Sequence, residues 1–206
     1  MSVLSRLAGA QGRKDEEPNK ELARDLVEKK DVGGIQEVVE NLTNADRRVQ
    51  TDCLSVLEQI GLLNPELIEG CVAGILALVF HKDNRIVWAA MIVLALVADR
   101  KPQEIFQRYE DLARVTEKGS VITKDNGIKT LARVAAAGGG YSSAIAPFLL
   151  EQLRTSRAKS VPQYAESIRV AVDADNQARY LAILNERFGE LSAAQQRRVK
   201  KVLKTF

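Results

Sequence analysis

The sequence predicts an all-α protein built from helical hairpins that repeat along the chain. Two boundary signals share one period, because Asp46 and Asp83 are 37 residues apart and Pro65 and Pro102 are also 37 residues apart. Apolar residues recur at helical spacing and nowhere alternate as they do in a β-strand. A hairpin with more apolar surface than it can bury alone is stabilised by stacking on its neighbours. The pattern therefore predicts a solenoid of about five hairpins.

The composition fits a helix-rich globular chain. Of 206 residues, 46% are hydrophobic, 28% are charged and five are proline. The longest apolar runs, 71–80 and 86–98, fall short of the roughly 18 to 20 residues that a membrane-spanning helix needs. The net charge of +3 is too small to require a polyanionic partner. We expect a cytoplasmic protein without membrane insertion, in which any contact with nucleic acid depends on local patches.

Residues 1–18 differ from the rest of the chain. The first ten residues lack the sustained apolar core of a secretory signal. The polar segment 11–18 ends in a proline and is typical of a flexible linker. We expect a short N-terminal stretch and flexible linker over 1–18 and a repeat domain over 19–206. A helix is expected at 20–30, followed by the pairs 32–43 with 46–62, 64–80 with 83–99, 102–117 with 124–138, 141–154 with 160–172, and 174–188 with 191–205.

Capping chemistry marks the helix starts. Asp46, Asp83 and Asp125 each precede an apolar run, and an aspartate there accepts hydrogen bonds from free first-turn amides. Asn64 followed by Pro65 is a further N-cap. The third copy is read at an offset of 42 residues, from Asp83 to Asp125, with its extra residues in a loop over 118–124. The last two second helices are expected to be capped by Ser160 and Ser192.

Core positions superpose at the 37-residue offset, because Val56 matches Val93 and Leu57 matches Leu94. Two helices per unit, a period near 37 to 40 and an aspartate opening the second helix resemble HEAT repeats over roughly residues 31–206. The resemblance implies a right-handed α-α superhelix, a HEAT-like or armadillo-type solenoid. Arginine commonly follows the valine in such repeats, but Gln50 and Val87 occupy that place here. An Asp–Arg ladder between neighbouring repeats is therefore not expected.

Five residues are candidates for a binding surface. Arg85 and Trp88 share one stripe of a second helix, and Arg48 precedes Arg85 by one period. If second helices line the concave face, as the resemblance implies, these residues form a basic strip with one large aromatic. Arginine and tryptophan dominate binding hot spots, although the sequence favours the alternative in which Trp88 packs in the core and the arginines are solvated. The full candidate set is Arg48, Arg85, Trp88, Lys129 and Arg133.

Other motifs favour structural roles. One histidine, His81, excludes multi-histidine metal sites and is expected in a solvated turn. Cys53 and Cys71 lie in apolar segments and are expected to be buried thiols of a reducing compartment. Residues 138–140 are three glycines without a phosphate-loop signature, and we expect a helix cap and hinge there. The C-terminal apolar residues Val199, Val202, Leu203 and Phe206, flanked by Arg197, Arg198, Lys200, Lys201 and Lys204, predict a capping helix.

These observations favour a non-catalytic scaffold that binds another protein, since no motif carries a reaction and no cofactor is implied. The alternative is a nucleic-acid-binding protein of the HEAT-like class, which the resemblance connects with alkylpurine DNA glycosylases. In that case the basic strip would contact phosphates and the tryptophan would stack on a base. A third possibility is an enzyme of another kind, such as a lyase that attaches bilins to a partner, as some members of the resembling class do.

Overall fold

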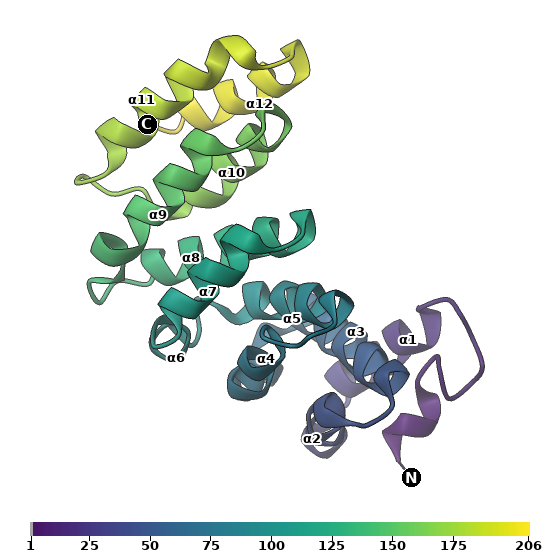
Figure 1. Ribbon diagram of the computed structural model, residues 1–206. Coiled ribbons are helices and arrows are strands. Elements are labelled where there is room, and N and C mark those ends of the chain that lie inside the picture. Colours follow the sequence, from purple (N-terminus) through teal and green to yellow (C-terminus); the bar gives the residue numbers. More distant parts are fainter. Residues whose placement is uncertain (1) are drawn as a thin grey trace. The chain divides into compact units, whose positions relative to one another are not determined.

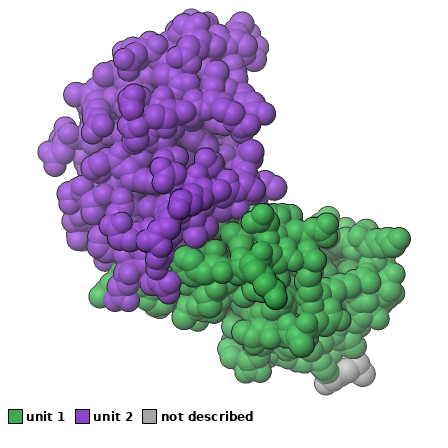
Figure 2. Space-filling model, viewed as in Figure 1, with its two compact units in different colours: residues 1–105 green, residues 106–206 purple. Residues whose placement is uncertain are grey.

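The computed structural model describes residues 2–206, and over this range the regular elements are all helical. The chain divides into two compact units, one ending at Ile105 and the other running from Phe106 to Phe206 (Figure 2). Each unit is a stack of helical hairpins and is described by itself. None of the helices between residues 2 and 206 has the length and apolar character required to cross a bilayer.

The first unit arranges its helices in two layers. One layer consists of α3 and α5, which are the second helices of their hairpins, together with α1, and we call it the second-helix layer. In it α1 packs on α3 and α3 packs on α5 (Figure 1). The other layer contains α2, the 3₁₀ helix η3 and α4. The bounds are η1 Val3–Arg6, α1 Glu17–Glu28, α2 Val32–Glu40, η2 Asn41–Thr43, α3 Arg47–Leu63, η3 Pro65–Cys71, α4 Val72–Leu78 and α5 Asn84–Val97.

The second unit repeats this arrangement. Helices α8, α10 and α12 form its second-helix layer, because α10 packs on both of the others, while α7, α9 and α11 form the other layer. A short helix, α6 Pro102–Phe106, spans the boundary between the units in sequence. The remaining bounds are α7 Tyr109–Lys118, α8 Val121–Ala136, α9 Tyr141–Thr155, η4 Ala158–Ser160, α10 Val161–Ile168, η5 Arg169–Ala171, α11 Gln177–Arg187, η6 Phe188–Glu190 and α12 Ala193–Leu203.

The five predicted hairpins are confirmed, and most predicted caps stand where expected. Asp46 and Asp83 accept hydrogen bonds from the amides of the second helical residues, and Asn64 does the same at η3. Ser192 forms a reciprocal capping box with Gln195. The expected cap at Ser160 is only partly realised, because this residue precedes α10 but its side chain accepts no first-turn amide.

The predicted cap at Asp125 is wrong. Helix α8 begins at Val121, and its N-cap is Ser120, whose hydroxyl accepts the amide of Thr123 at 3.2 Å. Asp125 therefore lies inside the helix, and the expected loop over 118–124 is mostly helical. The 37-residue period continues unbroken from Asp83 to Ser120. Serine caps a helix as well as aspartate does, so the change of residue type concealed the true repeat.

The continued register explains the core. Leu57, Leu94 and Leu131 are successive 37-residue equivalents, and each is fully buried. The same holds for the sets that begin at Val56 and at Ile60. One buried stripe per second helix thus supplies the interior of each unit, as stacked repeats require.

The glycines at 138–140 adopt the conformation expected of them. Gly138, Gly139 and Gly140 all have left-handed backbones, with φ of 86°, 64° and 79°. Gly140 is the residue before α9. Only glycine tolerates three such residues in succession without steric cost, so this segment reverses the chain between α8 and α9.

Candidate binding surface

The N-terminal segment, residues 2–13, packs against α1 and α3 of the first unit and also against α2, where Glu37 accepts the amide of Val3 at 3.0 Å. Val3, Leu7 and Ala8 are buried. The amide of Ala8 donates to Asn19 Oδ1 of α1 at 2.9 Å, and the amide of Gly9 donates to Asp52 Oδ2 of α3 at 2.7 Å. Side chains of two second helices therefore bind the backbone of another chain segment.

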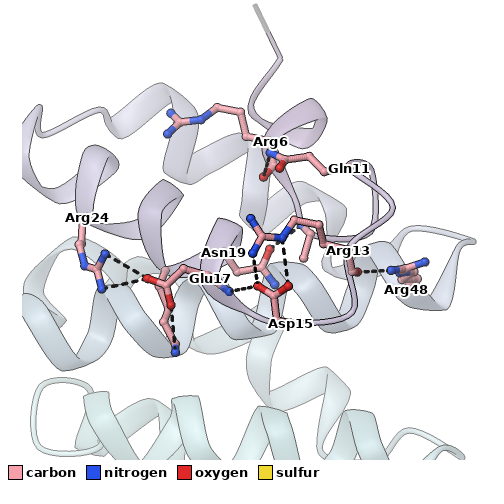
Figure 3. A network of polar contacts seen from close by, with 10 residues as sticks. Arg6, Gln11, Arg13, Asp15, Glu17, Asn19, Arg24 and Arg48 are labelled. Carbon is pink, nitrogen blue, oxygen red and sulfur yellow. Dashed lines mark hydrogen bonds and ion pairs between the residues drawn. The ribbon is translucent and has the colours of Figure 1, made fainter.

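Asn19 and Asp52 form the centre of this contact. Asn19 is fully buried, and its Nδ2 donates to Asp52 Oδ1 at 3.1 Å, so each carboxylate oxygen of Asp52 has its own donor. Figure 3 shows Arg13 of the segment in contact with Asp15 and with Arg48 of α3, close to Asn19. This pair could not be recognised from the sequence, because a buried asparagine in a first helical turn has no distinctive local motif.

Arg48, the first candidate residue, contributes to the same contact. Its side chain is exposed along α3, and its guanidinium donates to the carbonyl oxygen of Arg13 (Figure 3). Two residues of α3 thus hold the segment, Asp52 at Gly9 and Arg48 at Arg13. A Cβ added to Gly9 would lie 2.7 Å from Asp52 Oδ2 and 2.8 Å from Arg48 Nε, which shows how closely the segment approaches α3.

Arg85 and Trp88 lie one repeat further along, on α5. Arg85 is exposed, and its guanidinium forms no hydrogen bond or ion pair with any residue from 2 to 206. Trp88, three residues later, is partly exposed. Trp88 is therefore not fully buried in the core, and part of the indole is accessible to a ligand.

Lys129 and Arg133 lie together on α8 of the second unit. With Glu166, Ser167 and Val170 they line a groove of 220 Å³ between α8 and the α10–η5 segment. Burial lowers the pKa of Lys129, and the nearby positive charge of Arg133 lowers it further. The carboxylate of Glu166 is held by Arg198 of α12 at 2.6 Å.

In the corrected 37-residue register, the basic candidate residues occupy different positions of the repeat. Arg48 and Arg85 are equivalent to Ile122 of α8 and not to a basic residue. Lys129 is instead equivalent to Ile92 of α5. The structure thus brings Arg85 close to Trp88, and Lys129 close to Arg133, but the basic residues do not recur at one position of the repeat.

One rung of an Asp–Arg ladder is present, contrary to expectation. Arg47 Nε of α3 lies 2.6 Å from Asp83 Oδ2, so the cap of α5 also pairs with the preceding repeat. The arginine occupies the first helical position, directly after Asp46, and not the position after the valine. The pair was not expected from the sequence, because the pattern of HEAT repeats places the arginine after the valine.

The side chains that could bind a metal or act as nucleophiles include the histidine and the two cysteines. Among residues 2–206, no three histidine, cysteine, aspartate or glutamate side chains are grouped as a metal site would require. Cys53 and Cys71 are free and buried, as expected, and burial raises their pKa to about 12 and about 11. His81 is partly buried in its turn, where Nδ1 accepts the amide of Asp83 at 3.0 Å.

The C-terminal helix α12 matches its predicted apolar face only in part. Val199 and Val202 are buried, but α12 ends at Leu203 and Phe206 is 46% exposed. The Phe206 ring still contacts the ring of Tyr180, with centroids 5.7 Å apart. Lys200 lies 5.6 Å from the centroid of the Phe188 ring, so part of the basic cluster interacts with the protein itself.

Comparison with known proteins assigns the fold to the armadillo/HEAT-like helical repeats. An engineered protein has a TM-score of 0.69 at 22% identity, covering 99% of this chain and 96% of that one. A designed armadillo repeat protein in complex with the peptide (KR)4 has a TM-score of 0.70 at 14% identity, covering 91% and 86%. Kap121p bound to Pho4p has a TM-score of 0.67 at 14% identity, covering 97% of this chain but 22% of Kap121p. No protein-family model and no curated protein sequence matches the chain.

Proposed function

We propose that this protein is a non-catalytic scaffold whose second-helix layers bind a segment of another protein. The observation that carries the proposal is the contact between residues 8–13 and the layer formed by α1 and α3. There, Asn19, Asp52 and Arg48 hold backbone groups, which are common to every polypeptide. A surface that binds one chain segment in this way has the chemistry needed to bind another.

The open part of the same layer is the candidate site in the first unit. Arg85 offers an unpaired guanidinium, and Trp88 offers part of its ring within one helical turn. In the second unit, the groove beside Lys129 and Arg133 is the corresponding candidate. The designed armadillo protein in complex with a peptide and Kap121p bound to Pho4p support a binding role for folds of this kind. Use of a concave face, a cytoplasmic location and the absence of catalysis are parts of this proposal.

The test compares partner capture by the parent protein and by two double variants, with and without nuclease. Arg85→Ala/Trp88→Ala removes the candidate site of the first unit, and Lys129→Ala/Arg133→Ala removes that of the second. The control variant Lys118→Ala/Lys204→Ala also removes two exposed cations. Loss of a nuclease-resistant protein partner in either test variant, but not in the control, supports the proposal. Equal capture by all four proteins contradicts it.

Nucleic-acid binding is the second candidate, favoured by the cationic side chains of Arg85, Lys129 and Arg133. If these three side chains each neutralised one phosphate, the logarithm of affinity for duplex DNA would fall against the logarithm of salt concentration with a slope of about −2.7. Such a slope, together with loss of the captured partner after nuclease treatment, would favour this candidate. A salt-independent interaction would eliminate it.

A further inference from the structure

A cavity of 320 Å³ opens in the second unit, where the C-terminal end of α9 meets the first turns of α8 and α10. It is separate from the candidate binding surface, because neither Lys129 nor Arg133 lines it. Its polar lining includes Lys124 of α8, Gln152 of α9 and Arg157 of the loop that follows α9. These three side chains come from different elements and meet at one cavity.

All three side chains retain their hydrogen-bond donors. Within the part of the chain that the structure describes, Lys124, Gln152 and Arg157 form no side-chain hydrogen bond and no ion pair. Other cations near the same end of α9 are paired, since Arg154 binds Glu151 at 2.6 Å and Arg187 binds Glu190 at 2.9 Å. The unpaired hydrogen-bond donors at this end of α9 therefore lie at the cavity.

No carboxylate lines the cavity, but the carboxylate of Asp125 is close enough to interact with the charge of Arg157. Asp125 lies near Gln163 and Tyr164, and its Oδ1 is buried without a hydrogen-bond partner among the described residues. Burial raises the pKa of Asp125, and the positive charge of Arg157 opposes this effect. Two cations against one carboxylate leave a net positive charge for a ligand.

We propose that this cavity binds a phosphate dianion, either free inorganic phosphate or the phosphate of a phosphorylated side chain on a protein partner. A phosphate monoester carries about −1.5 to −2 charges at pH 7 and three strong acceptor oxygens. The guanidinium of Arg157 can bind two of these oxygens in parallel, and the ammonium of Lys124 and the amide of Gln152 can bind the third. The lining offers no free aromatic face on which a nucleobase could stack, because Tyr164 is 5% exposed.

The experiment is a titration of the full chain, followed by amide NMR and calorimetry. The ligands are inorganic phosphate, a short phosphoserine peptide and the same peptide without phosphate. We expect saturable shifts at residues 119–124 and 152–160. Lys124→Gln/Arg157→Gln should weaken phosphate binding at least about tenfold, since each cation contributes a charge-assisted hydrogen bond. The control Lys118→Gln/Lys159→Gln removes two exposed neighbouring lysines outside the cavity and should change affinity less than about twofold.

Comparing the affinities for the phosphoserine peptide and for inorganic phosphate also identifies the source of the phosphate. Binding of the phosphoserine peptide at least about tenfold tighter than inorganic phosphate identifies a phosphorylated partner, and equal affinity identifies the free anion. Unperturbed thermal melting of both double variants shows that they fold. The proposal is overturned if millimolar phosphate shifts no cavity amide, if Lys124→Gln/Arg157→Gln binds as the parent does, or if the unphosphorylated peptide binds equally well.

Discussion

Gly127 of α8 lies directly against Thr116 of α7, so closely that a Cβ on Gly127 would come within 2.0 Å of Thr116 Oγ1. Both residues are buried, and α7 and α8 form one hairpin. We predict that Gly127→Ala destabilises the second unit by about 1 to 3 kcal/mol, because overpacking outweighs the roughly 1 kcal/mol that alanine contributes over glycine in a helix. Denaturant unfolding of the variant measures the change.

The matched control for this substitution is Gly70→Ala. A Cβ at Gly70 meets no atom within 4 Å, so this variant should unfold close to the parent. Replacing Thr116 by alanine removes Oγ1 and Cγ2, which lie 2.0 Å and 2.7 Å from the position that the new Cβ at residue 127 would take, and should restore part of the lost stability in the double variant. Equal stability of Gly127→Ala and the parent would show that α7 and α8 separate without cost.

The corrected register makes a second prediction. Leu57→Ala, Leu94→Ala and Leu131→Ala should each lower the free energy of unfolding by about 2 to 5 kcal/mol, because each removes a fully buried side chain from an equivalent position. Leu62→Ala is the control, since Leu62 is 61% exposed in the same helix as Leu57. Calorimetric melting of the four variants tests the register, and a Leu131 variant that melts with the parent would contradict the third repeat.

The comparison of Ser120 with Asp125 shows how far the sequence specified the fold. Helical periodicity and caps such as Asp46 predicted every hairpin, because these signals act within a few residues. The third repeat was misplaced because Asp125 has the sequence neighbours of a cap. Asp125 lies inside α8 because Ser120 caps the helix five residues earlier, and two candidate caps so close together cannot be ranked from their side chains alone.

The candidate site was less predictable than the fold. Helical spacing predicted that Arg85 and Trp88 lie together, and they share α5 in the structure. The hydrogen bond between Asn19 and Asp52 joins residues 33 positions apart, so no motif could identify it. Lys124 could not be identified from the sequence either, because its ammonium is available to a ligand only if the fold places no acceptor beside it.

The third prediction concerns the N-terminal segment. Asp52→Ala removes the acceptor of the Gly9 amide and of Asn19 Nδ2, and the buried Asn19 amide would lose its partner. We expect hydrogen exchange to accelerate at residues 3–13 by at least about tenfold, the equivalent of losing about 1.4 kcal/mol of local stability, while α5 retains its protection. Thr51→Ala is the control, because its hydroxyl bonds only its own helix, to the carbonyl of Arg48. Unchanged exchange in Asp52→Ala would show that apolar packing alone holds the segment.

The fourth prediction concerns the two thiols. Because burial raises the pKa of Cys53 to about 12 and that of Cys71 to about 11, almost no thiolate exists at about pH 8. Alkylation by iodoacetamide should be slow in the native protein and fast after denaturation, and its native rate should rise with pH toward the raised pKa values. Mass spectrometry of each labelled cysteine follows both rates. Rapid native labelling of Cys53 at neutral to mildly basic pH would contradict its burial.

The last prediction concerns Arg187 of α11, which is 9% exposed and closes the C-terminal end of α9. Its guanidinium donates to the carbonyl oxygens of Leu153 at 3.1 Å and Ser156 at 2.7 Å, while Glu190 binds the same group from the other side. Arg187→Lys keeps the charge but cannot reach several acceptors with one ammonium. We expect a loss of about 2 to 4 kcal/mol in unfolding free energy, since hydrogen bonds to charged groups contribute about 1.5 to 3 kcal/mol each.

Arg179→Lys in the same helix is the control for Arg187→Lys, because Arg179 is exposed and should tolerate the exchange. Denaturant unfolding measures both variants, and hydrogen exchange at residues 153–157 reports directly on the end of α9. A selective rise in exchange there shows that the guanidinium fork holds the two hairpins together by binding free helix carbonyls. If Arg187→Lys and Arg179→Lys show the same unfolding free energy and the same hydrogen exchange, a positive charge at residue 187 is sufficient to hold the end of α9. The geometry of the guanidinium is then not required.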